Sequence, residues 1–353
     1  MNHVKQLAAL LFASEAEAML LTSEISQRYA VGFPFSDGFV LLLPDKTYLI
    51  TDFRYREEAM KHVDPSVTVI TPTVAIDFIR DTLRDAGAHR LMYENRALTC
   101  AVYEELLLPL GVELVPARGG IEALRAIKDE EEIDCIRRAQ AITDAAYSHI
   151  LSMLTPTMTE VDVVLELEFF MRRSGADGIA FPSIAVSGAA SALPHGLASR
   201  KPLSRGFLTM DFGATVNGYA SDMTRTVSIG KATPEMKRIY DTVLEAQRLG
   251  IEAITEGVAG KIVDAAARTH INAAGYRGLF GHSFGHGVGL EIHEMPRLSA
   301  RSEALLVAGN VVTAEPGIYV EGECGCRIED MGVVTADGFW DLTASSKEMI
   351  EVF

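Results

Sequence analysis

Two aspartates in a short hairpin are the first residues whose types and spacing could do chemistry. Asp211 and Asp222 flank an Asn-Gly pair at 217–218, which lies between two alternating runs and indicates a two-residue type I′ turn. With that turn Val216 pairs with Tyr219, and Asp211 lies diagonal to Asp222 on one face. Two carboxylates so close repel each other unless a cation or a proton lies between them. Taken alone, the pair fits equally well two solvated aspartates beside a turn.

A glycine-rich stretch at 281–294 concentrates the histidines. His282, His286 and His293 are three of the nine in the chain. Glycine lets the backbone approach a site closely and adopt unusual φ values. A single histidine here would indicate a hydrogen-bonded core residue, whereas three amid glycines favour a role in metal ligation or proton transfer.

Two glutamates lie at the ends of apolar runs. Glu315 follows the run 311–314, and Glu329 lies in the stretch 327–334, which we expect to be a second buried strand. An unpaired carboxylate at the end of a buried strand is costly. The alternative for Glu329 is an ion pair with Arg327 across the strand end. Two such glutamates, together with the hairpin and the histidines, favour a metal.

The candidate ligands form a set that is rich in oxygen and has no thiolate. They are Asp211, Asp222, His286, Glu315 and Glu329. Four carboxylates and one imidazole suit Mn²⁺ best, and Zn²⁺ or Co²⁺ less selectively. Five side chains with bridging carboxylates suit two ions about 3.5–4 Å apart, which together activate water and polarise a carbonyl. We therefore expect two divalent ions per subunit.

The elements that position these residues divide into two predicted domains. The chain has 353 residues, 48% of them apolar and 23% charged, which is typical of a globular protein with ample core. The turn-rich stretch 116–120 predicts a boundary that gives domains 1–118 and 119–353. In the first we expect a helix over about 4–19 and strands at 38–43 and 48–51. The net charge of 32 − 48 = −16 argues against an extended nucleic-acid surface.

The second predicted domain contains a weak internal repeat. A helix over about 128–153 and a second over 159–174 are followed by strands, and helices over 234–254 and 261–274 are again followed by strands. Two such halves would join in one central sheet, so a site between them could take ligands from both. The charged run 128–132 is interpreted as a solvated helix start, and no function is assigned to it.

Cysteine usage and the first residues bear on the compartment. Cys100, Cys135, Cys324 and Cys326 are too few and too scattered for a disulfide framework, so we expect reduced thiols. The apolar run at 7–13 is short and is followed by acidic residues, unlike a signal peptide. No segment reaches the ~20 apolar residues of a membrane helix. A cytoplasmic protein is expected.

The order Asp–Asp–His–Glu–Glu, on the motifs above, resembles the pita-bread metallopeptidase family M24 of methionine aminopeptidase, aminopeptidase P and prolidase. The resemblance covers nearly the whole chain. Residues 29–33 and 51–55 also resemble the creatinase-type N-terminal domain of the proline-specific branch, which methionine aminopeptidases normally lack. The resemblance implies an α+β protein, with a creatinase-like N-terminal α/β domain followed by a pita-bread catalytic domain.

The resemblance also implies roles for individual residues. The five candidates above would be the metal ligands, with Asp222 and Glu329 bridging both ions. Glu315 would also take a proton from the attacking water. His195 matches the family histidine beside the substrate, and His293 the one that steadies the scissile carbonyl or the tetrahedral oxyanion.

Further residues match positions around the ligands and the substrate. His282 and Arg327 fit places from which ligands are oriented. Arg297 and Arg301 lie where family arginines hold the carboxylate of a dipeptide, and Phe181 is a third candidate for substrate binding. Similar arginines occur in aminopeptidases, so they favour a dipeptidase only slightly.

The resemblance implies hydrolysis of the bond before proline by an Xaa-Pro dipeptidase (prolidase). That bond is a tertiary amide without an N–H, which deprives ordinary peptidases of a backbone contact. The alternative is an aminopeptidase P that acts on longer peptides. A non-catalytic peptide-binding module on the same fold is a remote alternative, because such proteins have lost ligands and all five are present here. We expect a homodimer that binds proline-containing dipeptides or short peptides, and neither nucleic acid nor membrane.

Overall fold

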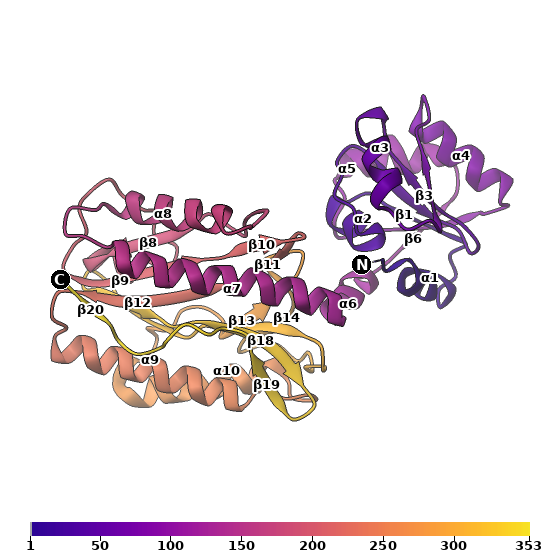
Figure 1. Ribbon diagram of the computed structural model, residues 1–353. Helices are drawn as coiled ribbons and strands as arrows, with labels where there is room; N and C mark the ends of the chain where they lie inside the picture. The colour runs from indigo at the N-terminus through magenta and orange to yellow at the C-terminus, as the bar shows by residue number, and fades with distance from the viewer. Residues whose placement is uncertain (1) are drawn as a thin grey trace. The chain divides into compact units, whose positions relative to one another are not determined.

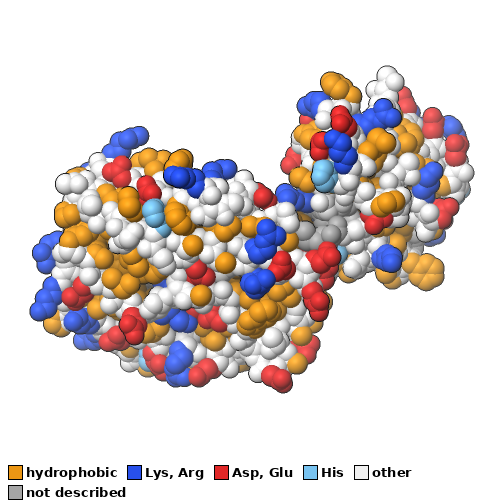
Figure 2. Space-filling model, in the orientation of Figure 1, with side chains coloured by type: hydrophobic (Ala, Val, Ile, Leu, Met, Phe, Trp, Pro, Cys, Tyr) orange, Lys and Arg blue, Asp and Glu red, His pale blue; other side chains and the backbone are white. Residues whose placement is uncertain are grey.

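The computed structural model describes residues 2–353, and the chain divides between Arg125 and Ala126 into two compact units. The sequence places the boundary seven residues earlier, at 118/119. Within the described residues, no helix is long and apolar enough to cross a membrane. On the face drawn in Figure 2, the described basic side chains are interspersed with acidic ones and form no continuous basic area, which agrees with the net negative charge.

The first unit contains a mixed six-stranded sheet in the order β4-β3-β2-β1-β5-β6 (Figure 1). Strand β2 runs antiparallel to both of its neighbours, and the other adjacent pairs are parallel. The strands are β1 (Ala18–Leu21), β2 (Phe39–Leu42), β3 (Thr47–Ile50), β4 (Val67–Ile70), β5 (Arg90–Tyr93) and β6 (Glu113–Pro116). The main helices are α1 (Val4–Phe12), α2 (Glu24–Val31), α3 (Phe53–His62) and α4 (Ala75–Asp85).

The first predicted helix, over 4–19, is too long. Helix α1 ends at Phe12, where the Ser14 hydroxyl donates to the Leu11 carbonyl at 2.7 Å. The apolar residues 18–21 instead form β1, which is buried along its whole length between β2 and β5. Burial against two neighbouring strands overrides the helical pattern, because a central strand buries both of its faces.

The second unit repeats an order of two helices followed by strands, as the sequence predicts. The first half has α7 (Glu130–Met153) and α8 (Glu160–Arg173), and the second has α9 (Pro234–Glu252) and α10 (Gly260–Ile271). In Figure 1 the strands lie between these two helix pairs. One buried core joins α7 and α8 to strands of the first half, and another joins α9 and α10 to strands of the second.

Matching backbone bonds confirm the repeat. Leu203 N–H donates to the Met158 carbonyl in the first half, and Leu306 N–H to the Val258 carbonyl in the second, both at 2.9 Å. Isolated bridges join Thr159 to Pro202 and Ala259 to Leu305. Each bond ties the loop before the second helix to the chain that follows that helix, so the two halves share one frame.

The strands of the second unit form four small sheets, ordered β20-β12-β9-β8, β14-β13-β15-β18-β19, β11-β10-β7 and β16-β17. The strands from the first half are β7 (Gly178–Ile179), β8 (Ile184–Ser187), β9 (Gly206–Phe212), β10 (Ala214–Val216), β11 (Tyr219–Ala220) and β12 (Met223–Ile229). The others are β13 (Gly285–Gly287), β14 (Glu294–Leu298), β15 (Val311–Ala314), β16 (Gly317–Val320), β17 (Cys324–Arg327), β18 (Asp330–Thr335), β19 (Gly338–Asp341) and β20 (Glu351–Val352).

The predicted strand over 327–334 is interrupted. Strand β17 ends at Arg327 and β18 begins at Asp330, so Glu329 lies between two strands of different sheets. There its backbone N–H donates to the Thr224 carbonyl on β12 at 3.1 Å. The break turns Glu329 towards the strands of the first half, which a continuous strand would not do.

Candidate active site

The aspartate hairpin forms with the predicted register. Val216 pairs with Tyr219, and the turn residues 217 and 218 have φ values of 48° and 76°, as a type I′ turn requires. Farther down, Asp211 on β9 faces Thr224 on β12. Gly213 is required beside it, because a Cβ there would lie 1.9 Å from the Ser221 carbonyl oxygen. Asp211 is therefore diagonal to Asp222, and both line one cavity.

That cavity, of about 410 Å³, brings together all five candidate metal ligands from both halves. Asp211 and Asp222 come from the first half, and the other three from the β13, β15 and β17–β18 segments of the second. His286, Asp222 and Glu329 are buried, and each offers one ligand atom within 4.8 Å of the others. The burial of all three residues distinguishes the cluster from acidic residues that merely share a surface.

His286 presents one ring nitrogen to the carboxylates. Its Nδ1 donates to the Gly287 carbonyl at 3.1 Å, which leaves the Nε2 lone pair facing the cavity. Nε2 lies 3.3 Å from Glu315 Oε1 and 3.6 Å from Asp222 Oδ2. Burial first, and then the neighbouring His293, lowers the pKa of His286 to about 3. The ring is therefore neutral at pH 7, as a metal ligand must be.

Asp211 has one oxygen that is held and one that is not. Oδ2 accepts from Arg327 Nη2 at 2.6 Å, while Oδ1 is buried and has no hydrogen-bond partner among the described residues. A buried carboxylate oxygen is rarely left unsatisfied, so Oδ1 fits a position facing a cation. Arg327 forms its ion pair with Asp211, and the alternative of a pair with Glu329 is wrong.

Tyr319 is a member of this site that the sequence did not reveal. Its hydroxyl accepts from Arg327 Nη1 at 2.9 Å and lies 2.8 Å from His282 Nε2. Because His282 Nδ1 donates to the Ser283 carbonyl, the tyrosine is the donor to Nε2. A continuous chain of contacts thus runs from Asp211 through Arg327 and Tyr319 to His282. The four-residue spacing from Glu315 to Tyr319, across a turn between two strands, is the only local signal.

Glu329 is fixed by both its side chain and its backbone. Oε2 accepts from the Thr224 hydroxyl at 2.6 Å, and the carbonyl accepts from Arg225 Nη1 at 2.6 Å. Adjacent residues of β12 therefore orient both ends of this glutamate. The other carboxylate oxygen is left for a ligand in the cavity.

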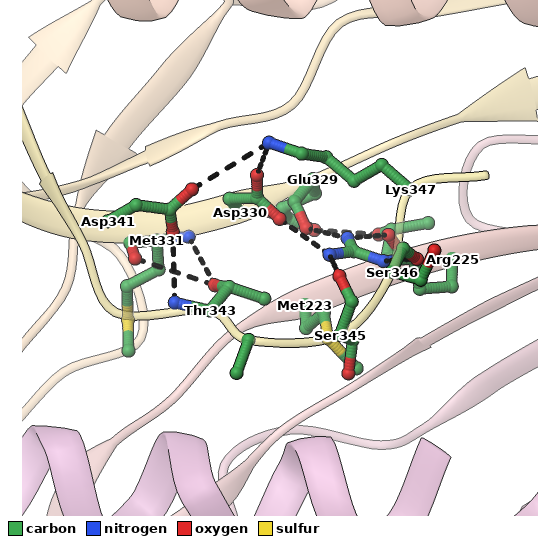
Figure 3. A network of polar contacts seen from close by, with 12 residues as sticks. Met223, Arg225, Glu329, Asp330, Met331, Asp341, Thr343, Ser345, Ser346 and Lys347 are labelled. Atoms are coloured by element: carbon green, nitrogen blue, oxygen red, sulfur yellow. Dashed lines mark hydrogen bonds and ion pairs between the residues drawn. The ribbon is translucent and has the colours of Figure 1, made fainter. Parts of the chain in front are cut away.

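Arg225 is the centre of a buried network that also binds the C-terminal segment (Figure 3). Its side chain is fully buried and contacts the Asp330 carboxylate at 2.7 Å, and Lys347 contacts the other oxygen of that carboxylate. The remaining four N–H groups donate to the carbonyls of Thr224, Glu329, Ser345 and Ser346. All five guanidinium donors are used. A charged residue inside the buried strand 223–229 was the available signal.

The carboxylates of the site raise one another's pKa values. Burial, followed by Glu329, Asp211 and Glu315, holds the pKa of Asp222 well above its usual range. Burial raises the pKa of Glu315 to about 8, and burial followed by Glu315 raises that of Glu329. Arg327 opposes each of these shifts. Excess negative charge of this kind is what divalent cations relieve, so the donor set fits a metal centre.

The remaining predicted residues differ in their placement. Phe181, His195, His282, His293 and Arg297 line the same cavity as the five carboxylate and imidazole groups. The His293 ring lies 4.3 Å from the His286 ring, and Arg297 faces His286 across the β13–β14 ladder. Arg301 is exposed and is not among the residues that line the cavity.

Comparisons with known proteins agree with this geometry. Residues 134–336 match the model described as metallopeptidase family M24, and residues 3–127 that of the Creatinase/Prolidase N-terminal domain. An Xaa-Pro dipeptidase of Pyrococcus horikoshii is 43% identical and covers 98% of both chains. A solved Xaa-Pro dipeptidase from Bacillus anthracis has a TM-score of 0.95 and 42% identity over 99% of each chain. An X-Pro aminopeptidase from Thermotoga maritima has a TM-score of 0.92 and 35% identity, over 98% of this chain and all of that one.

Proposed function

The chain belongs to metallopeptidase family M24, and we propose that it hydrolyses the peptide bond before proline in Xaa-Pro dipeptides. The observation that carries the proposal is the buried Asp211 Oδ1, which has no hydrogen-bond partner among residues 2–353 and lies in a cavity that also holds Asp222, His286, Glu315 and Glu329. Such a donor set fits divalent metal ions. The relatives that share 42–43% of its residues over almost the full chain are Xaa-Pro dipeptidases.

We propose that the same five residues, Asp222 and Glu329 among them, would hold two divalent ions per subunit, Mn²⁺ first. Four carboxylates and one imidazole favour Mn²⁺ over Zn²⁺ or Co²⁺. When bound, divalent ions supply Lewis-acid activation of water and of the scissile carbonyl. The protein supplies the orientation, through the bonds of Arg327 to Asp211 and of Thr224 to Glu329.

The chain's own residues handle the proton and the developing charge. Glu315 takes a proton from the attacking water and returns it to the proline nitrogen, a secondary amine that needs a proton to leave. His293, beside His286 in the cavity, donates to the oxygen of the tetrahedral state. His195 lines the same cavity and contacts the substrate.

A dipeptide differs from a longer peptide by the carboxylate that follows proline. Arg297 lines the cavity and provides a positive charge for that group, and Phe181 provides an apolar wall. Arg301, which lies outside the cavity lining, is a weaker candidate. The 35% identity to an X-Pro aminopeptidase keeps a second function open, the removal of the first residue from longer Xaa-Pro peptides.

Hydrolysis of an Xaa-Pro dipeptide and of a matched Xaa-Pro-Xaa tripeptide, each with and without Mn²⁺, tests the proposal. Metal-dependent cleavage of the dipeptide alone supports a prolidase. Efficient cleavage of the tripeptide favours the aminopeptidase. If the metal-loaded protein cleaves neither peptide, the proposed specificity is wrong.

We also propose that the chain forms a homodimer, on the resemblance to the proline-specific branch. Light scattering at working concentration should give about twice the mass of the 38.3 kDa chain. A mass equal to one chain contradicts the proposal.

A further inference from the structure

Arg225 lies between the candidate active site and the C-terminal segment 343–347. Its side chain is fully buried, and it does not line the cavity that holds the candidate ligands. Burying a guanidinium group is costly, and here the buried Asp330 carboxylate and four backbone carbonyls offset the cost. A residue in this place does not touch the substrate, so any part it has in the reaction must act through its neighbours.

Glu329 is the neighbour that belongs to the site. It lies in the break between β17 and β18, so no regular strand ladder holds its backbone. Thr224 donates to one oxygen of its carboxylate at 2.6 Å and accepts from its N–H at 3.1 Å. Arg225 holds the chain that follows, because it donates to the Glu329 carbonyl at 2.6 Å and to the Asp330 carboxylate at 2.7 Å. The direction in which the chain leaves Glu329 therefore depends on Arg225.

The guanidinium group is itself held from the other side by the segment 343–347 (Figure 3). The carbonyls of Ser345 and Ser346 accept from it at 2.7 and 3.0 Å, and Lys347 contacts the second oxygen of the Asp330 carboxylate. The segment belongs to no helix or strand, so these carbonyls are available as acceptors. A planar guanidinium group whose five N–H groups all have fixed acceptors is held in one orientation.

Two helices, one from each half, fix the segment. Asp144 on α7 accepts from the backbone N–H groups of Ala344 and Ser345 at 3.1 and 2.8 Å. The Tyr240 hydroxyl on α9 donates to the Lys347 carbonyl at 3.1 Å. A continuous series of contacts thus runs from the two helices, through the segment and the guanidinium group, to the backbone of the candidate ligand.

We propose that Arg225 is a positioning residue for Glu329, and that the segment 343–347 holds Arg225 in that position. The inference rests on the proposed function, because it takes Glu329 as a metal ligand. Replacing a residue that orients a ligand from behind typically weakens metal affinity by about 10- to 100-fold. A residue that only stabilises the fold leaves the metal affinity of the folded protein unchanged. Metal affinity therefore distinguishes the two roles.

The first experiment replaces Arg225 by methionine and by lysine. In Arg225→Met the Glu329 carbonyl loses this donor, while Asp330 keeps its contact with Lys347. Arg225→Lys retains the charge but offers three N–H groups in place of five, so at least two of the five bonds are lost. Leu167→Ala is the stability control, because Leu167 on α8 is fully buried in the core and does not line the cavity.

Mn²⁺ is titrated into each metal-free protein by calorimetry, under conditions in which circular dichroism shows that the protein is folded. Hydrogen exchange of residues 327–331 is measured on the same metal-free samples. In Arg225→Met we expect Mn²⁺ affinity to fall by about 10- to 100-fold and exchange of 327–331 to become faster. Arg225→Lys should lose less affinity. Leu167→Ala should keep the wild-type affinity although it unfolds more easily.

Asp144→Ala tests the segment without altering the buried guanidinium group. Asp144 is only half-buried, so we expect the fold to persist when the acceptor of two N–H groups of the segment is removed. Mn²⁺ affinity should fall by less than in Arg225→Met, because the segment keeps its bond from Tyr240. Asp134→Ala is the matched control, since Asp134 lies on the same helix and forms an exposed ion pair with Arg137. This control should match the wild type.

The double variant Asp144→Ala/Arg225→Met tests whether the segment acts through the guanidinium group. If it does, Asp144→Ala should change Mn²⁺ affinity by less than about twofold once Arg225 has been replaced. Additive losses in the double variant would show that the segment acts by another route, and would overturn that part of the inference. Should Arg225→Met fail to fold, the same comparison is made with Arg225→Lys.

Two outcomes overturn the inference as a whole: Mn²⁺ affinity within about twofold of the wild type in the Arg225 variants that fold, or an equal loss of affinity in Leu167→Ala. Failure of the proposed function gives a different result, in which the wild type binds Mn²⁺ but cleaves no Xaa-Pro dipeptide. The affinities test the positioning in that case as well, because they are measured without substrate.

Discussion

The two halves of the second unit each use a buried carboxylate on their second helix to anchor an active-site loop, but they satisfy it differently. In the first half Glu160, at the start of α8, accepts from Ser187 N–H at 2.6 Å, from the Ser187 hydroxyl at 2.8 Å and from Ser199 N–H at 2.9 Å. These donors lie at both ends of the segment that carries His195. In the part of the chain that the structure describes, the negative charge of Glu160 is stabilised by neutral donors alone.

In the second half the anchor is an ion pair. Asp264 on α10 is fully buried, accepts from Phe284 N–H at 3.1 Å and binds Arg268 through both oxygens at 2.7 and 2.8 Å. Arg268 in turn donates to the carbonyls of Phe280 and His282, at 2.6 and 2.7 Å. This segment carries His282 and leads to His286.

The difference shows what the repeat determines and what it does not. The shared frame determines where each loop leaves and rejoins the sheet. The loop that presents N–H groups needs only a carboxylate, whereas the loop that presents carbonyl groups needs a cation placed between them and the carboxylate. The proposed metal ligands differ in the same way. The first half offers two aspartates on one hairpin, and the second offers a histidine and two glutamates from three separate segments.

The largest effect is expected from removing an aspartate that the first half contributes to the shared site. Asp222→Ala should lower kcat/KM by at least ~10³-fold, since metal ions supply several kcal/mol of transition-state stabilisation. It should also remove bound metal while the fold is retained, because the substitution relieves repulsion among buried carboxylates. Metal analysis and circular dichroism on the purified variant check both points. Retained activity would mean that the ligand assignment is wrong.

The next prediction concerns the ion-pair anchor of the second half. Asp264→Asn leaves Arg268 without its charged partner, so we expect the free energy of unfolding to fall by about 2–3 kcal/mol. This value is below the 3–5 kcal/mol of a fully buried pair, because Arg268 is 27% exposed. Denaturant unfolding of the metal-free protein measures the change. A loss below about 0.5 kcal/mol, the size of most surface substitutions, would show that the backbone carbonyls suffice for Arg268.

Metal removal tests whether the buried carboxylates of the two halves repel one another. In the metal-free protein the folded-state pKa values of Asp222, Glu315 and Glu329 lie above their unfolded values, that of Glu315 at about 8. The folded state therefore binds more protons than the unfolded state, and stability falls as pH rises from about 4.5 towards 8. A bound divalent ion cancels this loss.

The melting temperature gained on adding Mn²⁺ should accordingly increase between pH 5 and pH 8. Thermal melts with chelator and with excess Mn²⁺, across this pH range, give the comparison. Asp222→Ala, which removes one of the repelling charges, is the control and should show a shallower loss of stability with pH in the chelated protein. A pH-independent gain would show that the three carboxylates are not repelling one another.

The sequence predicts the ligands and the hairpin because their patterns are local. The Asn-Gly turn determines the register that places Asp211 beside Asp222, and glycines mark the His286 segment. The long-range polar contacts cannot be predicted from local patterns. Lys128 meets Glu294 across 166 positions, and Arg225 meets Ser345 across 120, so neither partner is visible near the other. The sequence does not predict the interruption of the strand at Glu329 for the same reason. There the backbone N–H of Glu329 bonds to Thr224, which is distant in the sequence.

The smallest expected effect concerns the neutral-donor anchor of the first half. Glu160→Gln keeps one acceptor oxygen but turns an amide NH₂ towards N–H donors, so some of the bonds to Ser187 and Ser199 must break. Because no cation is left behind, the free energy of unfolding should fall by only about 1 kcal/mol, the usual net value of a lost hydrogen bond. The His195 segment loosens, and kcat/KM should fall severalfold while bound metal stays the same. Denaturant unfolding and metal analysis of Glu160→Gln, carried out in parallel with Asp264→Asn, provide the comparison. A loss in Glu160→Gln that exceeds the loss in Asp264→Asn would show that backbone donors hold a buried carboxylate more strongly than the guanidinium does, and that the first half is the more tightly anchored of the two.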